Sequence, residues 1–140
     1  MFRLDGKVAV VIGGAGGLGE ACAVALARQG ASVVVASRSL DKLQDVARKI
    51  KEDTGSEAIA MQVDVTSEES IARLAEQVVR RFQTVDILVN AQGINMKFPA
   101  VDIDVNSWDS LFATNVRGVA LACKHFGKVM IEKRKGKIIN

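Results

Sequence analysis

A glycine-rich turn directly after a short apolar run constrains this chain more than any other feature. The run spans residues 8–12 (VAVVI), and the next seven residues, GGAGGLG at 13–19, open an alanine-rich segment of helical period. Glycine permits positive φ and close approach of the backbone to a ligand, and the first amides of a helix attract anions. Strand, glycine turn and helix in this order predict a site for the diphosphate of a dinucleotide.

The spacing of these glycines fits two loop patterns. Read from Gly14 the loop matches G-x-G-x-x-G, and read from Gly13 it matches G-x-x-x-G-x-G, so spacing alone leaves the contact of each glycine open. A loop of the nucleoside triphosphatase type is excluded, because Glu20 and Ala21 stand where that loop needs a lysine and a hydroxyl.

Four more apolar runs follow along the chain. They are apolar on both faces, which is typical of parallel strands that helices cover from both sides. Together with 8–12, the expected strands are 33–36, 58–63, 87–89 and 138–139. Segments of helical period separate them, and no proline-rich or glycine-rich linker marks a domain boundary. This order predicts a doubly wound α/β domain, a Rossmann fold, with five parallel strands flanked by helices and an end directly after the fifth strand.

The expected helices begin at recognisable signals. The first spans 18–29, and the second spans 40–52 behind Ser39 as its N-cap. Thr66, with a glutamate three residues later, fits a capping box, so we expect it to start the third helix. The last helix, 107–134, is long and carries one apolar stripe. The stripe consists of Trp108, Phe112, Val116, Val119, Cys123, Phe126 and Met130.

Charge and cysteine content exclude several classes of protein. The chain carries 19 basic and 16 acidic side chains, and its net charge of +3 is too small and scattered for a nucleic-acid or membrane-surface binder. Without a membrane-length apolar run or a signal peptide, we expect a cytoplasmic protein that acts on a small molecule. Cys22 and Cys123 lie far apart, and His125 has no suitably spaced partners. We therefore expect no metal site and two buried packing cysteines.

The end of the second strand indicates which dinucleotide binds. An acidic side chain there would accept a hydrogen bond from the ribose 2′-hydroxyl of NAD. The sequence instead reads Ala36-Ser37-Arg38-Ser39, and the first carboxylate, Asp41, comes later. A guanidinium beside a hydroxyl suits a 2′-phosphate. We therefore expect NADP as the cofactor, with NAD as the alternative if Arg38 is only a solvated turn residue.

The glycine loop resembles that of the short-chain dehydrogenase/reductase family. The segment VIGGAGGLG at 11–19 is similar to the family's T-G-x-x-x-G-[IL]-G loop, with Ile12 in place of the threonine. This resemblance aligns the three family glycines with Gly13, Gly17 and Gly19.

Three further motifs carry the same resemblance, in the family's order and on the expected elements. Asp64-Val65 resembles the pair that meets the adenine, and NAQG at 90–93 resembles N-N-A-G apart from its two central residues. Asn115-Val116 resembles the N-[VL] motif that supplies a catalytic asparagine. The residues expected to bind the dinucleotide are Gly13, Gly16, Gly17, Leu18, Gly19, Ser37, Arg38, Asp64, Val65, Asn90 and Gly93.

The resemblance implies hydride transfer to or from C4 of a nicotinamide. In this family a tyrosine exchanges a proton with the substrate oxygen, a lysine lowers the pKa of that tyrosine, a serine orients the carbonyl and an asparagine anchors a relay water. Only Asn115 has a counterpart here, because the 140 residues include no tyrosine and the family's serine follows the strand that ends at Asn140. We therefore expect residues 1–140 to be a dinucleotide-binding domain without the catalytic C-terminal half, inactive alone.

Two functions from different classes stay open. The first is the cofactor-binding part of an NADP-dependent oxidoreductase that interconverts a secondary alcohol and a ketone. Its substrate would be a sugar acid, a polyol or a 3-oxoacyl group, because the pattern resembles gluconate 5-dehydrogenases and 3-oxoacyl-carrier-protein reductases. The second is a complete, non-catalytic module that binds a dinucleotide as a redox sensor or partner subunit. Residues 94–104 are expected to border the substrate, and helix 107–134 resembles the one through which the family forms homodimers and homotetramers.

Overall fold

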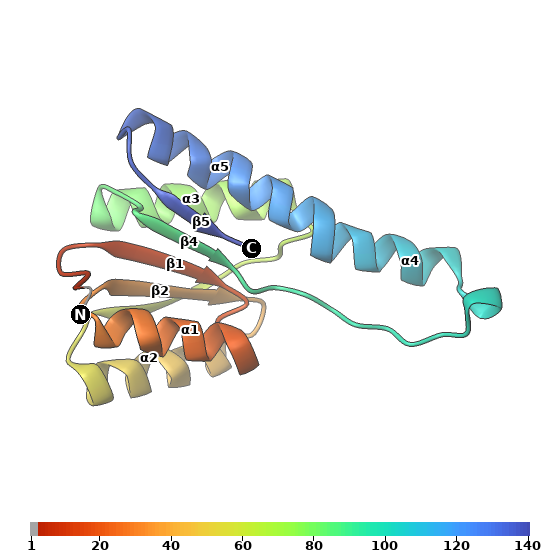
Figure 1. Cartoon of the computed structure of the whole chain (residues 1–140), viewed down its shortest axis with the longest axis horizontal. Helices are drawn as coiled ribbons and strands as arrows, with labels where there is room; N and C mark the ends of the chain where they lie inside the picture. Colours follow the sequence, from red (N-terminus) through yellow and green to blue (C-terminus); the bar gives the residue numbers. More distant parts are fainter. Residues whose placement is uncertain (1–2) are drawn as a thin grey trace.

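Five parallel strands form a single sheet in the computed structural model, which describes residues 3–140 (Figure 1). The strand order is β3-β2-β1-β4-β5, so the first strand lies in the middle of the sheet. The strands are β1 (Val8–Ile12), β2 (Ser32–Ser37), β3 (Ala58–Gln62), β4 (Ile87–Asn90) and β5 (Lys137–Ile139). The predicted doubly wound parallel sheet is confirmed, with boundaries that differ from the sequence prediction by one residue at most.

The central strand β1 is buried along its whole length because neighbouring strands flank both its edges and helices cover both its faces. Val10 of β1 is in register with Val34 of β2 and with Leu88 of β4. Successive side chains of a strand point to opposite faces, so β1 contributes to two cores. Val10 packs in the core on one face, and Val11 packs in the core on the other.

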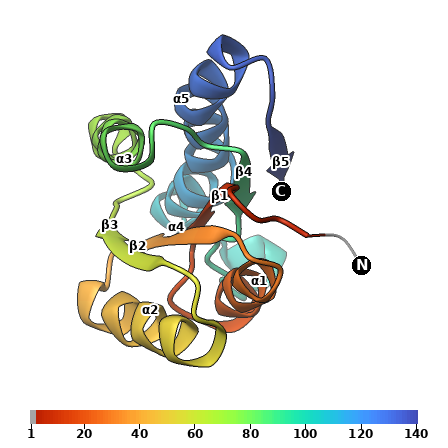
Figure 2. The ribbon, with the colours of Figure 1, turned by 90° about the vertical axis from the view of Figure 1, so that its left-hand side faces the viewer.

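Two layers of helices cover the sheet (Figure 2). Helices α1 and α2 bury apolar side chains with one face of the sheet, and α3 and α5 do so with the other face. The helical segments are α1 (Gly17–Arg28), α2 (Leu40–Thr54), α3 (Glu68–Phe82), the 3₁₀ turn η1 (Ala100–Asp102), α4 (Val105–Phe112), the π-helical turn η2 (Ala113–Arg117) and α5 (Gly118–Glu132). The core side chains thus come from all four helices that lie against the sheet.

The third helix starts one residue later than predicted. Ser67 is its N-cap, and the Ser67 hydroxyl accepts a hydrogen bond of 3.2 Å from the backbone N–H of Ser70. The hydroxyl of Thr66 instead donates to the carboxylate of Asp64 at 2.7 Å. The prediction of Thr66 as N-cap is wrong because Asp64 engages the first of two adjacent hydroxyl residues. Ser39 does precede α2 as predicted, but its side chain makes no capping hydrogen bond.

The predicted long helix is divided by the π-helical turn η2. Helix α4 begins after Asp104, whose carboxylate accepts hydrogen bonds from two backbone N–H groups of the first turn. A π turn closes its hydrogen bonds over one more residue than an α turn, so the faces of the helix shift across η2. Trp108 and Phe112 on α4 are exposed, whereas Phe126 and Met130 on α5 are buried. The predicted apolar stripe is therefore buried along α5 but exposed along α4, which projects beyond the sheet (Figure 1).

A buried carboxylate ties together the amino ends of the strands. The side chain of Asp86, just before β4, accepts a 3.0 Å hydrogen bond from the backbone N–H of Val8. Its other oxygen lies 3.0 Å from the ammonium of Lys135 and 3.8 Å from that of Lys7. Burial alone would raise the pKa of Asp86, but the Val8 and Lys135 hydrogen bonds and both lysine charges together hold it below its ordinary value.

The two cysteines are free, and both are half-buried rather than buried as predicted. Cys22 packs at the margin of the α1 and α2 core, and the sulfur of Cys123 lies 3.5 Å from the side-chain nitrogen of Asn90. Within residues 3–140 no three metal-ligating side chains gather into a group. In the same range, no helix combines the length and the apolar character needed to cross a membrane.

Candidate dinucleotide site

A cavity of about 740 Å³ opens at the carboxyl ends of the strands. Residues at or just after the carboxyl ends of β1, β2, β3 and β4 form much of its wall. Side chains of α4, which projects beyond the sheet, and of η2 also line it (Figure 1). The order of the strands reverses at β1, where β2 lies on one side and β4 on the other. In open parallel sheets, ligands bind at such a reversal, outside the carboxyl ends of the strands.

The glycine turn after β1 packs directly on the segment after β4. Gly13 has a φ of +83°, and a Cβ there would lie 2.6 Å from the carbonyl carbon of Ala91. A Cβ on Gly19 would overlap the carbonyl oxygen of Gly13. A side chain at either position would force the turn open, so these two glycines are required by the close packing of backbone on backbone.

The start of α1 is suited to an anion. Its N-cap, Gly16, lines the cavity and has no side chain that could cap the helix, and a Cβ added there would meet nothing within 4 Å. The backbone N–H groups of Gly13 and Gly14 donate to the carbonyl of Ala36 at 2.7 and 3.3 Å, so they are already engaged. Within residues 3–140 the amides of Gly17, Leu18 and Gly19 have no such partner, and a helix start of this kind binds phosphate. These features fit the diphosphate of a dinucleotide.

The end of β2 places a cation in the wall of the same cavity. Ser37 and Arg38 both line it, and the Ser37 hydroxyl accepts a 3.3 Å hydrogen bond from the backbone N–H of Ser39. The side-chain amide of Gln62, at the end of β3, donates to the carbonyl oxygen of Arg38 at 2.8 Å. This contact fixes the backbone of Arg38, while within residues 3–140 no carboxylate forms an ion pair with its guanidinium.

The loop after β3 forms the next part of the wall. One carboxylate oxygen of Asp64 accepts hydrogen bonds from the hydroxyl of Thr66 at 2.7 Å and from its backbone N–H at 2.9 Å. These two bonds, with a smaller effect of the Arg38 charge, lower the pKa of Asp64 below its ordinary value. The carboxylate therefore holds the shape of this loop, and Val65 beside it lines the cavity.

The segment after β4 lines the cavity, whereas the last residue of β4 does not. Asn90 does not line the cavity: it is buried, and its side-chain nitrogen donates to the side-chain oxygen of Asn140 at 2.8 Å. Ala91, Gln92 and Gly93 do line it. Both polar atoms of the Gln92 side chain are shielded from water and have no hydrogen-bond partner among residues 3–140.

Asn115 holds the cavity wall in place through hydrogen bonds to the backbone of Ile94. Its side-chain nitrogen donates to the carbonyl of Ile94 at 2.9 Å, and its side-chain oxygen accepts from the backbone N–H of Ile94 at 2.8 Å. Ile94 lines the cavity, whereas Asn115 lies in the π-helical turn η2 behind it. Both polar atoms of the amide are therefore used to hold the segment after β4 against the start of α5.

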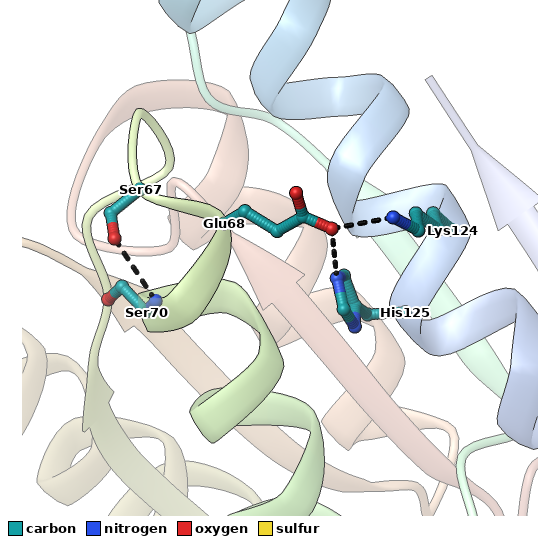
Figure 3. A network of polar contacts seen from close by, with 5 residues as sticks. All are labelled: Ser67, Glu68, Ser70, Lys124 and His125. Atoms are coloured by element: carbon teal, nitrogen blue, oxygen red, sulfur yellow. Dashed lines mark hydrogen bonds and ion pairs between the residues drawn. The ribbon is translucent and has the colours of Figure 1, made fainter.

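A polar cluster fixes the start of α3 against α5 (Figure 3). The carboxylate of Glu68 lies 2.6 Å from the ammonium of Lys124 and 3.0 Å from the ring of His125. The hydrogen bond from Lys124, followed by that from His125, lowers the pKa of Glu68. Arg117 adds a 3.1 Å hydrogen bond to the carbonyl of Thr66 in the cavity wall. The end of the loop that leads into α3 is thus held against η2 and α5.

The structure brings together seven of the eleven residues predicted to bind the dinucleotide. These are Gly13, Gly16, Ser37, Arg38, Asp64, Val65 and Gly93. Gly17, Leu18 and Gly19 follow in the first turn of α1, where Leu18 points outward with 74% of its surface exposed. Sequence reasoning missed Asp109, Ser110 and Thr114 of the wall. Ser110 and Thr114 are four residues apart, and this spacing is the signal that could have shown a shared helix face.

Comparison with known proteins shows which family the chain belongs to. A family model described as short chain dehydrogenase matches residues 7–140. The chain belongs to the short-chain dehydrogenase family. It corresponds to the N-terminal, cofactor-binding half of the family fold, as the four motifs predicted.

Relatives and solved structures of the family show how far the similarity extends. The chain is 37% identical over 139 residues to a D-threitol dehydrogenase of Mycolicibacterium smegmatis, covering 99% of this chain and 53% of that protein. It is 35% identical to an uncharacterized oxidoreductase of Staphylococcus aureus, covering 100% of this chain and 59% of that protein. The chain thus spans little more than half the length of these curated relatives.

Two crystal structures match the fold closely. A metagenomic short-chain oxidoreductase in complex with NADP superposes with a TM-score of 0.93 at 36% identity, covering 98% of this chain and 62% of the other. A short-chain type dehydrogenase/reductase from Mycobacterium marinum gives a TM-score of 0.94 at 32% identity, covering 98% and 56%.

Proposed function

We propose that this chain is the cofactor-binding part of an NADP-dependent oxidoreductase that interconverts a secondary alcohol and a ketone. The observation that carries the proposal is the single cavity that joins the uncapped start of α1 to the guanidinium of Arg38. The diphosphate would lie at the positive end of the α1 dipole, and the 2′-phosphate would lie at the cationic guanidinium of Arg38. The NADP bound to the metagenomic relative supports the same cofactor class.

The residues of this chain would bind and orient the dinucleotide. The amides at Gly17, Leu18 and Gly19 hold the diphosphate, and Ser37 with Arg38 hold the 2′-phosphate. Asp64 and Val65 shape the wall for the adenine, and Asn90 fixes the end of β4 that carries Gly93. The bound nicotinamide supplies a hydride acceptor or donor for the alcohol or ketone.

Asn115 is proposed as a positioning residue in this reaction. Each polar atom of its amide makes one hydrogen bond to the backbone of Ile94, so the side chain fixes the wall beside Gly93. A π turn such as η2 is frequent at functional sites, because it redirects backbone groups that an α-helix would use internally. The proton donor is not a tyrosine of these 140 residues, since the sequence contains none.

The substrate class we propose is a polyol. It is one of the three classes that the sequence resemblance implied, and the D-threitol dehydrogenase relative is named for a polyol substrate. We further propose that the complete protein is a cytoplasmic homodimer or homotetramer.

With the 140-residue chain alone, NADP and D-threitol, we expect binding of NADP and no increase in absorbance from NADPH. Turnover under these conditions would refute the proposal that the proton donor comes from outside this chain.

Titration of the chain with NADP and NAD tests the cofactor assignment. Arg38→Ala removes a charged hydrogen-bond donor, so we expect the Kd for NADP to rise about tenfold or more while the Kd for NAD changes little. Arg48→Ala is the matched control, because Arg48 is an exposed arginine of α2 that pairs with Asp45 away from the cavity. If NADP binds the Arg38 variant as tightly as the wild type, the assignment of Arg38 is wrong. If neither nucleotide binds the wild type, the proposed function itself is wrong.

A further inference from the structure

A second cavity of about 560 Å³ adjoins the first. Arg38, Val63 and Asp64 line both cavities, so a ligand in the first can extend into the second past these residues. The remaining wall of the second cavity comes from the end of β3 and from α3. These residues are Gln62, Ser70, Arg73, Leu74 and Gln77.

The charged side chains of this second cavity have an excess of positive charge. Its wall contains two arginines, Arg38 and Arg73, and one carboxylate, Asp64. One oxygen of that carboxylate accepts two hydrogen bonds from Thr66, and within residues 3–140 it forms no ion pair with either guanidinium. The cavity also offers the amides and hydroxyl of Gln62, Gln77 and Ser70, which suits an anion with several acceptor oxygens.

Arg73 is available to a ligand. Its only ion pair within residues 3–140 is with Glu69 one turn earlier on α3, at 3.9 Å, and the Arg73 side chain is 65% exposed. An exposed pair at this separation contributes little to stability, so the guanidinium is free to reorient toward a stronger partner. The helix that carries it is held in place, because the Ser67 cap and the Glu68 contacts to α5 fix its first turn (Figure 3).

We propose that Arg73 is a second specificity-determining residue of the dinucleotide site, and that Arg38 and Arg73 hold the 2′-phosphate of the cofactor between them at the junction of the two cavities. This proposal rests on the proposed function and adds to it a residue from a different element. Arginine suits the role because its planar guanidinium can donate two parallel hydrogen bonds to a phosphate. Two guanidiniums can satisfy more phosphate oxygens than Arg38 alone.

Two adenosine phosphates isolate this phosphate group from the rest of the cofactor. Adenosine 2′,5′-bisphosphate and 5′-AMP differ only in the 2′-phosphate, and neither needs the nicotinamide side of the cavity. We expect the wild-type chain to bind the bisphosphate more tightly in calorimetric titration. Arg73→Gln should reduce that preference about tenfold, which is the effect of one lost charged hydrogen bond, and should leave the Kd for 5′-AMP unchanged.

A matched variant and a conservative variant complete the experiment. Arg80→Gln removes an exposed arginine from the last turn of the same helix, away from both cavities, and should leave both affinities unchanged. Arg73→Lys should restore part of the preference, because lysine keeps the charge without the forked donors. An unchanged preference in Arg73→Gln, or an equal loss of both ligands, would overturn the role of Arg73. If the wild-type chain binds neither adenosine phosphate, the proposed function itself is overturned.

Discussion

Replacing Gly13 by alanine tests whether the glycine turn is held by backbone packing against the segment after β4. The added Cβ would lie 2.6 Å from three backbone atoms, the carbonyl carbon and oxygen of Ala91 and the nitrogen of Gln92. It would also place an L-residue at a φ of +83°. The backbone conformation costs about 1–2 kcal/mol and the overpacking about 1–3 kcal/mol, so we expect a loss of about 2–5 kcal/mol in the free energy of unfolding.

Urea denaturation measures this loss, and two other glycines provide the controls. Gly127→Ala lies in α5 where a Cβ meets nothing within 4 Å, so it should stabilise the protein by about 0.5–1 kcal/mol. Gly16→Ala has an extended φ of −178° and open space around its Cβ, so its stability should stay within about 0.5 kcal/mol of wild type. Because Gly16 lines the cavity, that variant should still bind NADP more weakly. A Gly13 variant as stable as the Gly16 variant would refute the packing argument.

Two further variants test the buried carboxylate and the amide clamp. Asp86→Asn should lower the free energy of unfolding by about 1–3 kcal/mol at pH 7. Because the fold lowers the pKa of Asp86, its contribution is complete above the unfolded pKa of about 3.9 and disappears as the pH falls through the folded pKa. The difference between wild type and variant, measured by denaturation from pH 7 to pH 2, should therefore shrink below about pH 4; a constant difference would exclude the charge as its source. Asn115→Ala should leave the backbone of Ile94 without its two partners, so the Ile94 amide should exchange its hydrogen at least tenfold faster by NMR, with no such change at Val10 in β1.

The parts of the fold that follow from local pattern could be predicted from the sequence. The strand at 8–12, the glycine turn and the start of α1 are adjacent in the chain, so their residue types specify one another. The seven cavity residues among the predicted set also follow short strands whose ends can be read from apolar runs. In a parallel sheet these strand ends share one edge, and this rule converts separate motifs into one site.

The features that sequence reasoning missed depend on contacts between distant residues. The clamp of Asn115 on Ile94 joins positions 21 residues apart, and the cluster around Asp86 joins Lys7 to Lys135. The π turn η2 depends on backbone hydrogen bonds rather than on a residue pattern, so its place in the helix could not be predicted from spacing. Each of these requires the packed structure.

The amino ends of the parallel strands stabilise the fold, and their carboxyl ends form the proposed binding site. The ion cluster of Asp86, Lys7 and Lys135 lies at their amino ends, and the cavities lie at their carboxyl ends. The buried length of β1 separates them, with no ionisable side chain between. Substitutions at the amino ends should therefore change stability, and substitutions at the carboxyl ends should change nucleotide preference. Because the hydrophobic strand separates the two sets of substitutions, their effects should add independently.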